Sequence, residues 1–588
     1  MENFTHRMHR LKLAGRLPDK SEIKKILASF SKKEWGGVAV LLFIFTLSAI
    51  LMLESINKSF MIEVPLRGGK ITEGIVGSPR FVNPVVAFSD TDQELLPLIY
   101  SGLMRRNSSG GLIPDLAEKY EISENGLIYT FTLKDDLYFH DGNPLTIEDI
   151  IFTIEKVKDP LLKSSKKAFF DGVTVEKIDD KTLKFTLRQP YASFLNNMTL
   201  GIIPGALWRG SPLELNDANT KPIGSGPYMI TEIGKKSSGI IEYYKLESFG
   251  KFALGSPYIK NLTLRFYPNE NEAISALRRG AVSQISSIAP SSAEVLKEEG
   301  YRVESSVLPR VFGLFFNQNQ NQIFTQKAVI RAINESVNKN RIVREILNNY
   351  GVPINSPIPP KMLPEQKSSE EKIFAREDIV LKVKNDLAKD GWKKGKEGYL
   401  EKIITEKGKK TTIPLQFSIS TGNAPELAKS AELIKENLEE IGMKVDIKTF
   451  EIGSLNQNVI RPRKYDVLLF GQIVGNESDL FAFWHSSQRK DPGLNVAMYT
   501  NVKVDKILED AFATLDEKEK NKKYAEFEAE IKKDMPAVFL YSPSFIYIVA
   551  KNLRGLVMNQ ITSPTDRFLN IYSWYTEVDN VWKIFAPN

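Results

Sequence analysis

The feature that most constrains this chain is an apolar run near its N-terminus, residues 35–53, in which nineteen consecutive residues carry no charge. At about 1.5 Å per residue, a helix of that length crosses roughly the 30 Å hydrocarbon core of a bilayer. A buried core helix and a cleaved signal peptide are the alternatives. The length of the run and the lysines before it disfavour a core helix, and no convincing Ala-x-Ala cleavage site follows it. We expect a retained transmembrane anchor.

Charge predicts the orientation of this anchor. Residues 1–34 hold nine Lys or Arg and four Asp or Glu, which is about +5 of the formal net charge of +7. The positive-inside rule places this basic tail in the cytoplasm and the chain after about Glu54 outside. A lysine-rich amphipathic helix in the tail suits an anionic leaflet, unless the lysines only set the topology. We expect a single-pass protein of the cell membrane with an extracytoplasmic C-terminal domain.

Composition and missing motifs disfavour several classes of protein. The chain has no cysteine, and of its four histidines only His140 and His485 lie beyond residue 50, so disulfides, thiolate sites and histidine-rich metal sites are not expected. After residue 34 the net charge is only about +2, which argues against a nucleic-acid partner. The sequence contains no P-loop, dinucleotide fingerprint, H-E-x-x-H or G-x-S-x-G motif. We expect no enzyme, no cofactor and no metal.

The chain beyond the anchor mixes strand and helix patterns. Residues 413–420 are typical of a strand, 425–441 of a helix closed by a glycine, and 445–447 of a second strand, which together form a βαβ unit. A further apolar strand over 465–470 ends at Gly471. The fold class is therefore α/β, with a parallel or mixed sheet. Ligands of such sheets commonly bind at the carboxyl edge of the strands.

Short motifs follow one another in an order that resembles a known family. The chain carries R-F-V-N-P at 80–84, F-H-D-G at 139–142, P-I-G-S-G-P-Y at 222–228 and M-P-A-V-F-L-Y at 535–541. This order resembles the extracytoplasmic solute-binding proteins of family 5, the peptide- and nickel-binding components of ABC importers. The resemblance covers about residues 68–558. Most of these motifs are turns, connections or stiffened loops, so they identify a fold rather than a ligand.

The resemblance implies two α/β lobes around a cleft after one N-terminal transmembrane helix. This is a periplasmic-binding-protein-like fold of type II, with an extra domain inserted in the first lobe. The expected parts are residues 1–34 for a basic cytoplasmic tail, 35–53 for the anchor, 67–110 with 222–310 and 545–588 for a discontinuous lobe I, 111–221 for the inserted domain and 311–544 for lobe II.

The resemblance also implies a function without chemistry on the ligand. The protein would be a membrane-anchored, extracytoplasmic substrate-binding protein of an ABC importer. It would be a monomer that captures peptides by hinge closure and presents them to permease subunits. Two alternatives keep the fold: a non-transport surface sensor or scaffold, and a receptor for a non-peptide polar solute such as an oligosaccharide. Nickel is a weaker candidate because the body holds only two histidines.

The ligand site is expected where the pattern departs from that of peptide-binding relatives. Those relatives use an aspartate after a G-W dipeptide to meet the peptide α-amino group, whereas here Gln472 replaces the tryptophan and Gly475 the aspartate. Either Glu477 or Asp479 would supply the carboxylate, or the α-amino group is not recognised in the usual way. The structural alternative is that both carboxylates cap the helix that follows. The expected ligand-binding residues, any of which could instead serve packing, are Thr91, Gln472, Asn476, Glu477, Asp479, Trp484 and Tyr541.

Overall fold

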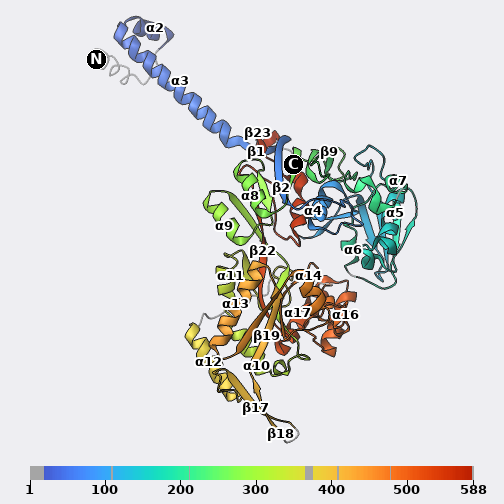
Figure 1. Ribbon diagram of the computed structural model, residues 1–588. Coiled ribbons are helices and arrows are strands. Elements are labelled where there is room, and N and C mark those ends of the chain that lie inside the picture. The colour runs from blue at the N-terminus through green and yellow to red at the C-terminus, as the bar shows by residue number, and fades with distance from the viewer. Residues whose placement is uncertain are drawn as a thin grey trace. The chain divides into compact units, whose positions relative to one another are not determined.

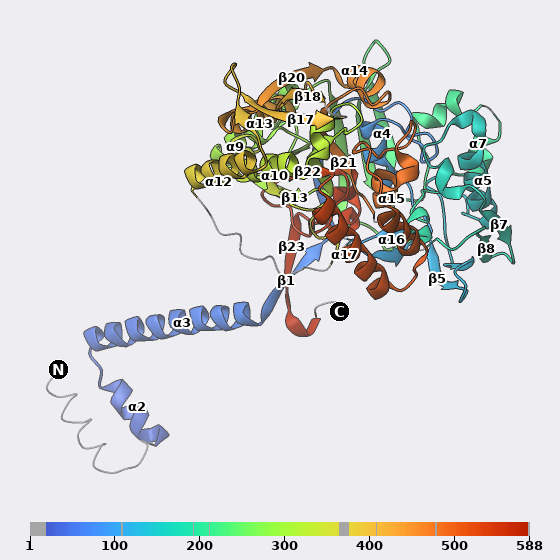
Figure 2. The same cartoon turned by 90° about the horizontal axis from the view of Figure 1, so that it is seen from below.

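The chain divides into two compact units (Figures 1 and 2). The computed structural model describes residues 19–107, 110–191, 193–210, 212–363, 375–406, 409–476 and 479–585. The smaller unit comprises Met1–Leu66 and Val578–Asn588, and the larger unit comprises Arg67–Glu577. The smaller unit contains the apolar run, and the larger unit contains the main sheet and the hydrophobic cores.

The helices of the smaller unit are α2 (Lys20–Ala28) and α3 (Lys32–Phe60). The predicted anchor lies within α3, which extends beyond it at both ends. A capping box starts α3, because the Ser31 hydroxyl accepts the amide of Glu34 while the Glu34 carboxylate accepts the amide of Ser31. No described side chain of α3 is buried, and its length and composition would allow it to cross a membrane.

A two-stranded ribbon follows α3. β1 (Met61–Leu66) begins directly after the helix and pairs with β23 (Glu577–Trp582). Trp582 Nε1 donates a hydrogen bond of 2.8 Å to Asn57 Oδ1, and the centre of its ring lies 6.5 Å from that of Phe60. The last turns of α3 are thereby tied to the end of β23.

The larger unit is built on one mixed sheet of twelve strands. In their order of pairing, ten of them are β20 (Lys444–Phe450), β19 (Gln416–Gly422), β21 (Val467–Ile473), β14 (Arg310–Phe316), β22 (Ala537–Val549), β12 (Gln284–Ser286), β2 (Gly68–Val76), β11 (Ile259–Tyr267), β10 (Ile241–Ser248) and β9 (Tyr228–Lys235). The other two, β13 (Arg302–Val307) and β15 (Gly351–Pro353), pair with β22.

Strand β22 is shared by two halves of this sheet. Its residues 537–541 pair with β14, whereas its residues 544–549 pair with β13. The chain thus passes from one half to the other within β22, at residues 541–544. It also passes between the halves at residues 308–309, between β13 and β14. We call the part on the β2 side the first half and the part on the β14 side the second half. The division into lobes at the expected residues stays a prediction.

Helices cover both faces of the second half (Figure 1). Alternate residues of β14 enter different cores, with Leu314 and Phe316 on one face and Phe315 on the other. The first face packs against α10 (Lys327–Ser336), α11 (Lys339–Glu345), α12 (Arg376–Lys389) and α13 (Pro425–Glu440). The second face packs against α14 (Ile452–Leu455), α15 (Asp479–Trp484), α16 (Val502–Ala513) and α17 (Glu517–Asp534).

The predicted βαβ unit is confirmed, with two differences in its strands. β19 and β20 are parallel and joined by α13. The strand predicted over 413–420 is two strands, because β18 (Lys409–Pro414) ends before β19 starts at Gln416. The prediction that the next strand ends at Gly471 is wrong, since β21 continues to Ile473. Glycine is needed there because a Cβ would lie 2.6 Å from the ring of Phe312.

The smaller sheets lie beside these halves. A four-stranded sheet joins β5 (Ala117–Ile122), β6 (Ile128–Leu133), β8 (Thr182–Thr186) and β7 (Thr174–Lys177). β3 (Met104–Arg106) pairs with β4 (Leu112–Pro114), and β17 (Leu400–Glu406) pairs with β16 (Lys393–Lys394) and β18 (Lys409–Pro414). The helices α4 (Asp90–Ile99), α8 (Glu270–Arg278) and α9 (Pro290–Glu298) contact the first half. The helices α5 (Ile147–Lys158), α6 (Phe194–Asn197) and α7 (Gly205–Trp208) lie at the four-stranded sheet. One hydrophobic core runs through the four-stranded sheet and much of the first half.

Two of the sequence motifs are bonded to each other. The Gly224 amide donates to His140 Nδ1 over 3.3 Å, and His140 Nε2 lies 3.0 Å from the Gly226 carbonyl oxygen. These bonds require the neutral ring with its proton on Nε2. A Cβ at Gly226 would lie 2.6 Å from the Ile99 carbonyl carbon, so only glycine fits beside the end of α4. The G-S-G-P run is therefore a structural connection, and His140 belongs to it.

Candidate functional site

A cavity of about 380 Å³ opens beside α4. Its walls come from α4, β3, the region around the short helix η2 (Lys167–Phe170), the chain near α6, and the helix η8 (Pro564–Phe568). Asn476, in the loop between β21 and α15, is the residue of the second half that lines it. The cavity therefore combines the first half of the sheet with a loop of the second half.

Three basic and two acidic side chains line this cavity. Arg105 is committed to the protein, because its Nε donates to Asp115 Oδ2 over 2.8 Å in a buried ion pair. Asp566 accepts hydrogen bonds from Thr562. Arg106 donates from Nη2 to Asn196 Oδ1 over 2.7 Å, which leaves its charge without a carboxylate partner among the described residues. The wall therefore carries a small excess of positive charge.

Lys166 is the basic residue of the wall that is free to bind a ligand. Within the described ranges its ammonium makes no hydrogen bond or ion pair with the protein. The side chain is accessible to solvent, yet the protein around it lowers the pKa of Lys166 by desolvating the charged form. An anionic group of a ligand would compensate that desolvation, because it favours the charged form.

A buried charge network holds two walls of the cavity together. Arg567 of η8 donates from Nη2 to Glu94 Oε2 of α4 over 2.6 Å and to Glu73 Oε1 of β2 over 3.1 Å. The Tyr547 hydroxyl donates to the other oxygen of Glu73 over 2.6 Å. All four side chains are buried, and burial raises the pKa of Glu94 in spite of the guanidinium beside it. The network positions α4 and η8 relative to β2.

The loop expected to recognise an amino group lies at this cavity. Asp479 is the first residue of α15, and its Oδ2 accepts the amide of Asn476 over 3.1 Å. The same oxygen lies 3.7 Å from the point where a Cβ of Gly475 would be. Asp479 therefore bonds to the loop backbone, and it also brings a carboxylate next to the position of the aspartate of relatives. Glu477 lies outside the described residues.

The other predicted site residues do not line the cavity. The Thr91 hydroxyl donates to the Val76 carbonyl oxygen over 3.2 Å in the first turn of α4. Trp484 is fully buried against Phe539, and the Tyr541 ring stacks on that of Phe312 with centres 4.9 Å apart. Their place in a ligand site stays a prediction.

Gln472 and Trp484 are buried without hydrogen bonds between their side-chain polar atoms and other described residues, and Gln472 has two such atoms. It is 2% exposed on β21, and neither atom of its side-chain amide has a hydrogen-bond partner in the part of the chain that the structure describes. An unpaired buried amide costs free energy that only a polar partner can recover. Among the predicted residues that are described, only Asn476 lines the cavity.

Sequence reasoning missed the basic residues of the wall. Arg105 and Arg106 are adjacent in the sequence, which is a visible signal in a body of nearly neutral charge. Lys166 gives no such signal, because it lies in a lysine-rich segment, and only the fold shows that it lines the cavity while Lys163 does not.

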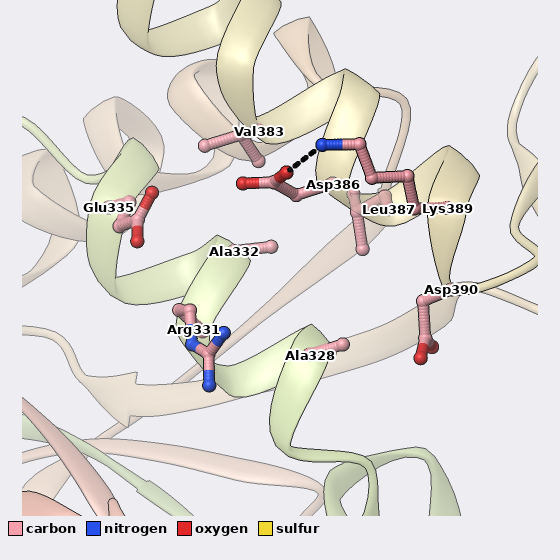
Figure 3. Close-up of a pocket in the computed structure, with 9 residues that line it drawn as sticks. All are labelled: Ala328, Arg331, Ala332, Glu335, Val383, Asp386, Leu387, Lys389 and Asp390. Carbon is pink, nitrogen blue, oxygen red and sulfur yellow. Dashed lines mark hydrogen bonds and ion pairs between the residues drawn. The ribbon is translucent and has the colours of Figure 1, made fainter.

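A second pocket, of about 340 Å³, lies between α10 and α12 (Figure 3). Ala332, Val383 and Leu387 form its apolar surface, and charged side chains surround them. Several of these charges are paired within the protein, as in the bond of 3.2 Å between Lys389 Nζ and Asp386 Oδ1 drawn in Figure 3. The pocket is confined to the second half and contains none of the predicted ligand residues.

Comparisons with known proteins agree on one family. Residues 111–492 match the description "Bacterial extracellular solute-binding proteins, family 5 Middle". The chain is 27% identical over 520 residues to the oligopeptide-binding protein AppA of Bacillus subtilis, covering 87% of this chain and 92% of that protein. The structure of that protein with a nonapeptide matches 87% of this chain and 99% of its own, at 26% identity and a TM-score of 0.64.

Two further solved structures are similar. The ABC transporter substrate-binding protein CtaP of Listeria monocytogenes is 26% identical, with a TM-score of 0.71 over 87% of this chain and all of its own. NikZ of Campylobacter jejuni, solved with Ni(L-His), is 26% identical, with a TM-score of 0.66 over 86% of this chain and 99% of its own. These likenesses confirm the predicted two-lobed α/β fold of periplasmic binding proteins.

Proposed function

This chain belongs to the bacterial extracellular solute-binding proteins of family 5, as its motif order predicted, and from that premise we propose that it captures peptides for an ABC importer. Proteins of this family bind solutes without chemistry, so the chain is a binding protein and not an enzyme. Its general role is that of a substrate-binding protein of an ABC importer for peptides or related ligands. The likeness to a protein named for oligopeptides, over 520 residues, supports peptides as the ligand class.

The observation that carries the peptide proposal is the distribution of charge at the cavity. A peptide with free termini has a carboxylate at one end and an ammonium at the other. Lys166 offers the cavity an ammonium without a protein partner, and the loop that brings Asn476 to the cavity also contains the Asp479 carboxylate. We propose that Lys166 meets an anionic group of the peptide and that Asp479 replaces the aspartate found at position 475 in relatives.

We propose that the two halves rotate about the two segments that connect them and thereby enclose the peptide. Residues 308–309 and 541–544 connect the halves, and a change of backbone angles in these two segments would rotate one half against the other. A peptide that contacts both halves would favour the closed form, which the permease would recognise. Helix α3 is proposed to anchor the chain in the cell membrane, with the larger unit extracytoplasmic.

The test uses the full chain in detergent and pairs of peptides that differ only at their ends. Native mass spectrometry first identifies co-purified ligands after denaturing release. Calorimetry then compares each short peptide with its C-terminally amidated form. We expect amidation to weaken binding about tenfold in the wild type, because it removes the charge-assisted bond to Lys166, and to have little effect in Lys166→Met.

The matched control is Lys163→Met, which changes a lysine of the same segment that does not line the cavity. This variant should keep the tenfold effect of amidation. The N-terminal end is tested in the same way, with each peptide compared with its N-terminally acetylated form. Acetylation should weaken binding to the wild type and have little effect on binding to Asp479→Asn. If no peptide of any form binds and the released ligand is an oligosaccharide or a nickel complex, the peptide proposal is wrong. If nothing binds at all, the sensor or scaffold role is favoured.

A further inference from the structure

Four large apolar side chains are exposed at the end of α3 that is followed by β1. Phe60 is 59% exposed, Trp582 46%, Ile584 76% and Phe585 72%. Phe60 ends α3, and the other three come from the end of β23 and from the short helix η10 (Lys583–Phe585). We call these four residues the juxtamembrane cluster. The four residues come from segments more than 500 residues apart in the sequence, so no local pattern predicts the cluster.

Specific contacts hold the two segments together. Trp582 Nε1 donates to Asn57 Oδ1 over 2.8 Å, and the rings of Trp582 and Phe60 lie 6.5 Å apart. The pairing of β1 with β23 fixes the backbone beside them. The cluster is therefore attached to the helix by hydrogen bonds and ring packing, while its apolar surface stays exposed.

The position of the cluster along α3 corresponds to the level of lipid headgroups. Phe60 lies seven residues beyond Leu53, where the uncharged run ends, which is about 10 Å along a helix. The headgroup layer on each side of a bilayer is roughly 5–8 Å thick, and ordinary helix tilt shortens the projected distance. Tryptophan and phenylalanine are stable at this level because their rings are apolar and the indole N–H is polar.

We propose that the juxtamembrane cluster inserts into the outer headgroup region of the bilayer that α3 crosses. Its occupant is lipid, because the cluster lies about two turns beyond the apolar run of a helix that has no buried side chain among those described, past the exposed Glu54–Lys58 ion pair. The inference rests on the proposed anchor. It adds a second attachment, in which the C-terminal strand is held to the membrane surface and limits the tilt of α3.

The absence of cysteine from the chain allows a direct test. Single cysteines are introduced into the full chain as Ile584→Cys and Phe585→Cys, the protein is reconstituted in phosphatidylcholine nanodiscs, and each cysteine receives a nitroxide label. Collision of the label with oxygen, which concentrates in lipid, is compared with collision with a water-soluble nickel chelate. Leu47→Cys, inside the proposed span, and Ile403→Cys, on exposed β17 of the larger unit, are the references.

We expect labels at 584 and 585 to collide with the nickel chelate at least threefold less than the label at 403. They should collide with it more than the label at 47. Trp582→Ala in the Ile584→Cys background should expose the label, because it removes the bond to Asn57 and the ring contact.

Each contrary result has a separate meaning. Equal accessibility at 584, 585 and 403, with position 47 protected, would overturn the inference and leave the anchor intact. An accessible label at 47 would overturn the anchor and this inference with it. Peptide binding by each labelled variant shows that the larger unit is folded, so an unfolded variant cannot be mistaken for either result.

Discussion

At the scale of single residues, His140 is a titratable side chain whose role is structural. Both of its ring nitrogens are bonded to the Gly224–Gly226 connection, so the ring must be neutral. Desolvation by burial lowers the pKa of His140 to about 4, and protonation of Nδ1 would also break the bond from the Gly224 amide. The residue has no nitrogen left for a metal.

His140 predicts an acid-sensitive stability. Because its folded pKa of about 4 lies below the ordinary value of 6.5, the unfolded chain takes up the proton first as the pH falls. The contribution of His140 is therefore fully present above pH 6.5 and is lost between about pH 6.5 and pH 4. It amounts to about 3 kcal/mol. Denaturant unfolding at several pH values should show that His140→Gln is less stable at pH 7 but has a shallower loss toward pH 4.

The control for this prediction is Leu215→Ala, at an exposed position without a titratable group. It should retain the pH dependence of the wild type. If wild type and His140→Gln lose stability in parallel between pH 6.5 and pH 4, the proposed role of the His140 bonds is wrong.

At the scale of elements, the walls of the cavity are positioned by buried charge rather than by local pattern. Arg567 connects α4, β2 and η8, and its two carboxylate partners lie more than 470 residues away in the sequence. A buried ion network is weak evidence for net stability, because desolvation of the charges offsets their attraction. Its energetic importance is instead that removal of one member leaves the others unpaired.

Arg567→Met should therefore destabilise the protein by about 3–5 kcal/mol, because Glu73 and Glu94 would remain buried without a cation. Denaturant unfolding of the full chain gives this value. Arg344→Met, which breaks an exposed ion pair with Glu345, should change stability by less than about 1 kcal/mol.

A triple variant separates charge burial from lost packing in this prediction. Arg567→Met combined with Glu73→Gln and Glu94→Gln should recover part of the lost stability, since neutral amides cost less to bury than unpaired carboxylates. A triple variant that is less stable than Arg567→Met alone would contradict this explanation.

At the scale of the whole molecule, the chain connects the two halves at residues 308–309 and 541–544, and the cavity is lined from both halves. The second half is covered by helices on both faces and should move as one body. Ligand-driven closure would change distances between the halves while leaving those within the second half unchanged.

Closure can be measured with pairs of fluorophores on introduced cysteines. Leu215→Cys with Val502→Cys joins exposed positions in different halves, and Ile403→Cys with Val502→Cys joins two exposed positions of the second half. A bound peptide should change the energy transfer of the first pair and leave that of the second unchanged. Peptide binding that changes neither pair would show that capture proceeds without closure.

Features that depend on neighbouring residues could be predicted from the sequence alone. The apolar run predicted a long helix, and hydrophobic periodicity with a closing glycine predicted the βαβ unit of β19, α13 and β20. The order of motifs predicted the family and the two-lobed fold. Each of these signals lies within a short stretch, so local conformational preference and spacing were enough to recognise it.

Which side chains line the cavity depends on the packing of distant segments. Trp484 and Tyr541 have the composition of a binding wall but are buried in the core, whereas Lys166, which sequence reasoning did not select, lines the cavity. The contacts of Arg567 with Glu73 and of Trp582 with Asn57 join residues hundreds of positions apart. Such pairs are brought together by the packing of whole elements, which is driven by burial of apolar surface that no single segment achieves before folding.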